Sequence, residues 1–154
     1  MAQMHQSLHA LGGIGHELAR LWALALLAEG HGAMGQLDAG HTVLAEALSL
    51  VESGGERFYA AELHRLKGEL LLQQSSDNAI VAESCFHQAI AIAQNQQAKS
   101  FELRAATSLA RLWQQQGKRQ EAHDLLAPVY GWFTEGFDTA DLQDAKALLD
   151  ELRA

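Results

Sequence analysis

A packing pattern of three residues recurs along the chain at nearly constant spacing. Each copy has a small residue, a large apolar residue four places later and a further contact residue three places after that. The copies begin at Gly40, Ala82 and Ala122, which lie 42 and 40 residues apart. Spacing of i, i+4 and i+7 puts the three side chains on one stripe of a helix, where the small residue allows a neighbouring helix to approach. The pattern therefore predicts three equivalent helices. The stripes are Gly40, Leu44 and Ala47; Ala82, Phe86 and Ala89; and Ala122, Leu126 and Val129.

A second helical segment precedes each stripe, so each repeat is expected to be a helical hairpin. Gly35 and Gly117 each stand five residues before the small residue of a stripe, where a left-handed residue ends the preceding helix. In the middle repeat the turn reads QQSSDN, and Asp77 or Asn78 is expected to cap the next helix. The expected repeats cover residues 14–54, 55–97 and 98–136.

A last helix is expected over residues 138–153, with Asp138 or Thr139 as its cap. Its apolar residues follow helical spacing and its other face is charged, which is how a stack of repeats covers its open end. Composition agrees with helix throughout, because the chain has a single proline and many Ala, Leu, Gln and Glu residues. We expect one all-α domain over residues 1–154, with about three hairpins and a C-terminal capping helix.

Charge and hydropathy limit the classes of partner. The formal net charge is -8 and no run of Lys and Arg is present, which argues against nucleic acid as a partner. The longest apolar run, residues 21–28, is far shorter than the roughly 20 residues of a membrane span. The single cysteine, Cys85, fits a reducing compartment, and the start of the chain lacks the pattern of a secretory signal. A cytoplasmic location is expected.

Two short motifs resemble cofactor or metal sites but lack an essential part. Residues 30–35 read GHGAMG, the spacing of a dinucleotide fingerprint, but a helix rather than a strand is expected before them. His16 and Glu17 begin like a zinc-protease HExxH helix, yet Arg20 occupies the position of the second histidine. We interpret the glycines as a helix end with its turn, and no cofactor is expected.

The remaining histidines and the cysteine do not form a recognisable site. His5 and His9 stand one helical turn apart, but no third ligand lies near them in the sequence. His87 is two residues from Cys85 on an expected helix and so points to another side. No metal site and no catalytic residue are expected.

The hairpins and glycine turns resemble tetratricopeptide (TPR) repeats, with a period above the usual 34 residues. The segments GERFYAAELHRLKGELLLQ and QQAKSFELRAATSLARLWQQQGKRQEAHDLLAPVYGWFTEGFDTADLQDAKALLDEL closely resemble a more specific group. This group is the TPR-like C-terminal region of large bacterial regulators that carry a nucleotide-binding ATPase module, often linked to adenylate or guanylate cyclase or DNA-binding domains. The resemblance covers about residues 20–152 and implies a right-handed α-α superhelix. No P-loop occurs in the chain, so ATP hydrolysis is not implied.

The resemblance also implies where a partner binds, since the first helix of each TPR hairpin lines a concave groove. Trp22 and Glu29 of the first repeat are weaker candidates than the polar positions of the next two. The candidate partner-binding residues of those repeats are Glu62, Arg65, Glu69, Arg104, Thr107, Arg111 and Gln114.

The arginines among these candidates have two interpretations. Arg65, Arg104 and Arg111 can hold a carboxylate or an acidic peptide through forked hydrogen bonds. Alternatively, the same arginines pair with Glu62, Glu69 and Glu102 on solvated faces. The second interpretation is favoured.

These features predict a non-catalytic protein–protein interaction scaffold, the partner- or signal-binding arm of a bacterial regulatory ATPase. Its expected partners are proteins, peptides or other domains of a larger regulator. The alternative is an oligomerisation module that forms a homodimer through an exposed apolar face. One candidate face is the aromatic cluster at Tyr130, Trp132, Phe133 and Phe137, although packing beneath the last helix is the favoured role of these residues.

Overall fold

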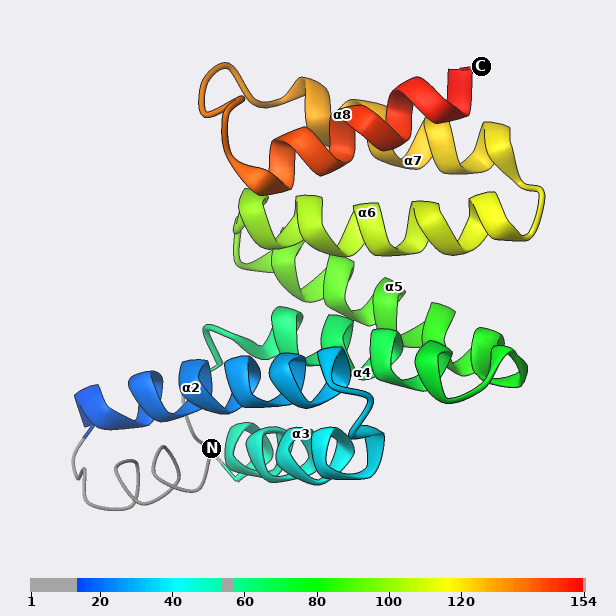
Figure 1. The fold of residues 1–154 in the computed structure, drawn as a ribbon. Coiled ribbons are helices and arrows are strands. Elements are labelled where there is room, and N and C mark those ends of the chain that lie inside the picture. The colour runs from blue at the N-terminus through cyan, green and yellow to red at the C-terminus, as the bar shows by residue number, and fades with distance from the viewer. Residues whose placement is uncertain (1–13, 54–56, 154) are drawn as a thin grey trace.

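All regular secondary structure in the described part of the chain is helical (Figure 1), which confirms the expected all-α class. The structure is a computed structural model, and it describes residues 14–53 and 57–153. The elements, in chain order, are α2 (Ile14–Ala33), α3 (Leu37–Glu52), α4 (Ala60–Gln74), the short 3-10 helix η1 (Ser76–Asn78), α5 (Ala79–Asn95), α6 (Lys99–Gln115), α7 (Arg119–Gly131) and α8 (Ala140–Arg153).

Helices that follow one another in the chain pack against each other, and the elements stack in chain order from α2 and α3 to α8 (Figure 1). The helices α2 and α3 lie within residues 14–54, α4 and α5 within 55–97, and α6 and α7 within 98–136. The last helix, α8, covers the side of α6 and α7 that faces away from α5.

The small and large residues of the three stripes are buried where helices meet. Leu44, Phe86 and Leu126 are almost fully buried, and so are the small residues that precede them. Val129 is half-buried and packs against the core that contains Phe86 and Leu126. Phe86 owes its place to Gly68 on α4, because a Cβ atom at position 68 would lie 2.5 Å from the phenyl ring. The pattern of small and large residues is thus a pattern of helix contacts.

The turns agree with the sequence at the glycines but not in the middle repeat. Gly35 and Gly117 have φ of 73° and 80°, which confirms the expected left-handed helix ends. Asn78 occupies the expected N-cap position of α5, but its side chain makes no capping hydrogen bond and instead donates to the Leu71 carbonyl. The side-chain cap in this turn is Ser75, whose hydroxyl accepts from the Asp77 backbone N–H at 3.1 Å at the start of η1.

The described helices bury two apolar cores. The first is formed by α2, α3 and α4, with Leu21, Leu24, Leu44 and Leu63 nearly inaccessible to solvent. The second is formed by α5, α6, α7 and α8 around Phe86. The helix α4 joins the two cores, because it packs against α2 and α3 on one side and α5 and α6 on the other.

Alternate helices differ in how they contact each other. The helices α2, α4, α6 and α8 form a continuous row, because α2 touches α4, α4 touches α6 and α6 touches α8. Among the described residues, α3 and α5 have no such contact, and neither do α5 and α7. We call the side formed by α2, α4, α6 and α8 the inner face.

Candidate binding groove on the inner face

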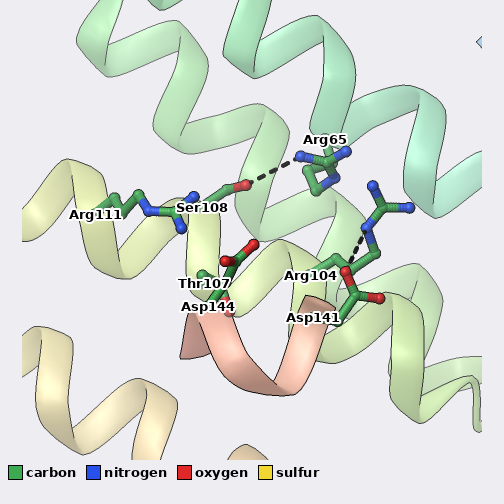
Figure 2. A pocket seen from close by; sticks show the side chains of 7 residues that line it. All are labelled: Arg65, Arg104, Thr107, Ser108, Arg111, Asp141 and Asp144. Atoms are coloured by element: carbon green, nitrogen blue, oxygen red, sulfur yellow. Dashed lines mark hydrogen bonds and ion pairs between the residues drawn. The ribbon is translucent and has the colours of Figure 1, made fainter. Parts of the chain in front are cut away.

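The inner face contains a polar pocket that brings all three candidate arginines together (Figure 2). Its volume is about 80 Å³, well below the hundreds of Å³ of a pocket for a small-molecule ligand. The side chains come from α4, α6 and α8, so no single repeat builds it. The lining residues are Arg65, Arg104, Thr107, Ser108, Arg111, Asp141 and Asp144.

Glu62 lies beneath this pocket and is the centre of its electrostatics. The residue is only 5% exposed, and its carboxylate accepts two hydrogen bonds from Arg65, at 3.0 Å from Nε and 2.6 Å from Nη2. Arg104 approaches the same carboxylate at 2.8 Å. A buried carboxylate is stable only when it is paired in this way. Glu62 therefore ties α4 to α6.

Arg65 is held as a charged group in a buried position, with its side chain 11% exposed. Burial alone lowers the pKa of Arg65. The hydrogen bond and charge of Glu62, together with the charges of Glu69 and Glu29, outweigh this effect and raise the pKa above its usual value. Arg65 also donates to the Ser108 hydroxyl at 3.4 Å, a second link from α4 to α6.

An outer set of carboxylates surrounds the two arginines. Glu29 of α2 lies 3.8 Å from Arg65 and 3.7 Å from Arg104, and Glu69 lies 3.9 Å from Arg65. Asp141 of α8 lies 3.5 Å from Arg104 (Figure 2). The structure thus pairs Arg65 with Glu62 and Glu69, and Arg104 with Glu62, as the favoured interpretation expected. The expected solvated setting is wrong for the pair of Arg65 and Glu62, because both side chains are largely buried.

Glu102 was also expected to pair with an arginine, and that expectation is wrong. It lies on another side of α6, where it pairs with Lys99 at 3.0 Å and accepts from Gln94 at 3.1 Å. The reason is helical periodicity, because Glu102 and Arg104 are two positions apart and point in different directions.

The remaining candidates on α6 occupy different environments. Thr107 is buried and its hydroxyl donates to the Leu103 carbonyl of its own helix at 2.7 Å. Gln114 lies outside the polar pocket and donates to Glu151 of α8 at 3.2 Å. Arg111 is exposed and lines the pocket together with Asp144, without a hydrogen bond or ion pair to any described residue.

An apolar pocket of about 100 Å³ adjoins the polar one and shares Arg104 with it. Trp22 and Leu26 of α2 form one wall, and both side chains are largely exposed, Trp22 to 50%. Glu29 and Glu62 lie at its polar edge. The other lining residues are Ala25, Tyr59, Leu66, Phe101 and Arg104.

Aromatic side chains hold the rim of the apolar pocket in place. Tyr59 and Phe101 lie with ring centroids 5.9 Å apart, and Phe58 contacts both rings at 5.0 and 5.7 Å. Phe58 is itself half exposed. Edge and tilted contacts are favourable arrangements of aromatic rings, so these contacts stabilise the pocket wall.

Sequence reasoning missed several residues of the two pockets. Asp141 and Asp144 were read as part of a solvated face of the last helix, and Tyr59, Phe101 and Leu26 were not singled out. The spacing of Asp141 and Asp144, one helical turn apart, was the available signal. Only the packing of α8 on α6 brings Asp141 and Asp144 close to Arg104 and Arg111.

The other motifs have ordinary structural roles where the structure describes them. Residues 30–33 of GHGAMG belong to α2 and Gly35 forms the turn, as interpreted from the sequence. Cys85 is buried, and burial raises the pKa of its thiol. Among the described residues, no three His, Cys, Asp or Glu side chains are grouped so that they could hold a metal ion. His5 and His9 lie outside the described residues, and so do the side chains of His16 and Glu17.

In the part of the chain that the structure describes, no helix has both the length and the apolar character required to cross a bilayer. Comparison of the chain with protein-family models, with curated protein sequences and with solved structures finds no match.

Proposed function

We propose that the chain is a non-catalytic protein–protein interaction module that binds its partner on the inner face. The observation that carries this proposal is the apolar pocket beside the polar one, with Trp22 and Leu26 left open to solvent. An exposed aromatic residue in a pocket with a charged edge is typical of the residues that dominate binding energy in protein interfaces. The continuous row of four helices offers room for an extended partner.

The module fits the role of a partner- or signal-binding arm in a larger bacterial regulator with an ATPase module. That assignment is an inference from the sequence resemblance to the TPR-like arms of such regulators. The hairpin pairs α2/α3, α4/α5 and α6/α7, with α8 packed on the last of them, support it. In this role other domains of the same regulator are partners as well.

Affinity capture with face-specific variants tests the proposal. The tagged chain, Trp22→Ala and Ile80→Ala are each used to capture proteins from an extract of the source organism. Ile80 is 85% exposed on α5, outside the inner face, and so provides a matched control for loss of an exposed apolar residue. A partner retained by the unmodified chain and by Ile80→Ala, but lost with Trp22→Ala, supports the proposal. Equal retention by all three contradicts it.

Self-association is the second candidate function, and the turn between α7 and α8 favours it. Trp132 and Phe137 are about half exposed there, while Tyr130 and Phe133 pack against the core. The expected packing role thus holds for only part of the aromatic cluster. Light scattering over a dilution series separates the two functions: a monomer at all concentrations excludes this candidate. A dimer that Trp132→Ser with Phe137→Ser dissociates supports it.

A further inference from the structure

The charges of the inner face identify the chemistry of the partner. Around the two pockets, three guanidinium groups, from Arg65, Arg104 and Arg111, face five carboxylates. The formal net charge of this group is therefore -2. The five carboxylates belong to Glu29, Glu62, Glu69, Asp141 and Asp144.

An acidic partner meets an unfavourable site, because the arginines are already neutralised. Arg65 is buried against Glu62, and Arg104 contacts three carboxylates within 3.7 Å. Arg111 has no such partner, but Asp144 lines the same pocket. An incoming carboxylate must displace one of these groups or lie beside it, and either change is costly.

A basic partner meets carboxylates that retain solvent-exposed oxygens. The side chain of Glu29 is 53% exposed and that of Asp141 is 42% exposed. Both carboxylates lie within 3.7 Å of one guanidinium, that of Arg104, so they are neighbours. Glu29 also lines the apolar pocket. A cation that approaches the exposed side of these carboxylates is attracted to both and repelled by Arg104, but the five carboxylates outnumber the three guanidinium groups, and the chain's overall charge of -8 also favours its approach.

We infer that the inner face binds a peptide segment in which a bulky aliphatic residue is followed by lysine or arginine. The aliphatic side chain enters the apolar pocket beside Trp22 and Leu26, whose volume of about 100 Å³ suits a single side chain. The cation lies against Glu29 and Asp141. This inference rests on the proposed function and specifies the partner that the same groove selects.

Binding of four fluorescein-labelled peptides of 12 residues to the full chain tests the inference. The peptides differ at two sets of positions: leucine anchors with lysines, leucine anchors with glutamines, leucine anchors with glutamates, and alanines with lysines. Fluorescence anisotropy is expected to give the tightest binding for leucine with lysine. Replacing lysine by glutamine is expected to weaken binding about fivefold, and replacing lysine by glutamate is expected to weaken it further. Raising NaCl is expected to reduce the difference between lysine and glutamine.

Variants assign the two parts of the site. Glu29→Gln with Asp141→Asn should abolish the preference for lysine over glutamine. Trp22→Ala should weaken the binding of every leucine peptide severalfold. The matched controls are Glu121→Gln, at an exposed position on α7, and Ile80→Ala. They should change neither the preference for lysine nor the affinity for the leucine peptides. Circular dichroism of each variant verifies that it is folded.

Two results would overturn the inference. Tightest binding of the glutamate peptide, or equal affinity for all three leucine peptides, shows that the carboxylates do not select the partner. If Trp22→Ala still weakens the binding of these peptides, binding at the apolar pocket stands and only the inferred chemistry of the partner is wrong. Absence of binding by all four peptides also rejects the inference, while the capture experiment with natural partners judges the proposed function separately.

Discussion

Gly68 shows how a single residue decides the packing of two helices. Its Cα faces the ring of Phe86, and an added Cβ would lie 2.5 to 3.0 Å from three ring carbons. Phe86 is fully buried and cannot move aside without disturbing its core. Gly68→Ala is therefore expected to lower the free energy of unfolding by about 1–3 kcal/mol, measured by urea denaturation.

Gly131 provides the control for that substitution. It ends α7, and an added Cβ would meet no atom within 4 Å. Gly131→Ala is expected to leave stability unchanged or raise it by up to about 1 kcal/mol, because alanine has fewer conformations in the unfolded chain. Equal losses for the two variants would show that the Phe86 contact is not the cause.

His64 is expected to make stability depend on pH. Burial lowers the pKa of its imidazole, and the positive charge of Lys67 adds to the effect, while Glu52 opposes it. Between the lowered folded value and the ordinary value of 6.5, the unfolded chain binds more protons than the folded one. The contribution of His64 is thus present above pH 6.5 and is lost as the pH falls through the folded pKa.

Urea denaturation at several pH values between 7.5 and 5 measures this effect. The unmodified chain should lose stability on acidification, and His64→Gln should lose less over the same range. An identical pH profile for the two proteins would contradict the assignment to His64.

Single residues also mark the limit of the sequence reasoning. Phe86 and the small residues of the stripes were predictable, because burial repeats with the helical period. The burial of Glu62 was not, since it depends on Arg104 of α6, which meets Glu62 only in the folded chain, whereas the pair with Arg65 lies within α4.

At the scale of elements, the turns repeat the same left-handed conformation with different residues. Gly35, Gly117 and Gly136 have positive φ, and so does Gln97, at 56°, between α5 and α6. A side chain with a Cβ is strained in this region by about 1–2 kcal/mol, whereas glycine is not.

Opposite effects are expected for substitutions at two of these turns. Gln97→Gly should raise the free energy of unfolding by about 0.5–1 kcal/mol, because relief of strain exceeds the added freedom of the unfolded chain. Gly117→Ala should lower it by about 1 kcal/mol, since no neighbouring atom but only the backbone opposes the Cβ. Thermal and urea unfolding measure both. A loss for Gln97→Gly as large as that for Gly117→Ala would contradict the account.

The helices themselves were largely predictable, and the middle turn was not. Hydrophobic spacing and glycines located each helical segment to within a few residues. In QQSSDN, however, several side chains are able to cap a helix, and only the three-dimensional path places η1 before α5, with Ser75 as its side-chain cap and Asn78 at the start of α5 without a capping hydrogen bond.

At the scale of the whole molecule, one ion-pair network joins all four helices of the inner face. Arg104 of α6 contacts Glu29 of α2, Glu62 of α4 and Asp141 of α8. Glu62→Gln leaves Arg65 in a buried position without its closest carboxylate, and a loss of about 3 kcal/mol in the free energy of unfolding is expected.

The exposed pair between Lys146 and Asp150 is the comparison for this network. Its atoms lie 3.1 Å apart, but both side chains are mostly in solvent. Lys146→Gln should cost less than about 1 kcal/mol in the same urea denaturation. If Glu62→Gln costs no more than Lys146→Gln, the network does not stabilise the stack.

The two pockets of the inner face were predictable only in part, because helices far apart in the sequence line them. Resemblance to TPR repeats placed the candidates on the first helix of each hairpin, and Arg65, Arg104, Thr107 and Arg111 do line one pocket. The aspartates of α8 and the apolar wall of α2 join it across 30 residues or more of sequence, by contacts that no local pattern encodes.

Site-specific photocrosslinking in cells of the source organism tests most directly whether the inner face is the working surface. A photoreactive phenylalanine analogue replaces Leu26 on the inner face or, in a second protein, Ile80 on the outer side; both side chains are exposed. If the inner face binds the partner, a cross-linked partner is expected from position 26 and none from position 80. Cross-linking from position 80 with none from position 26 would contradict it.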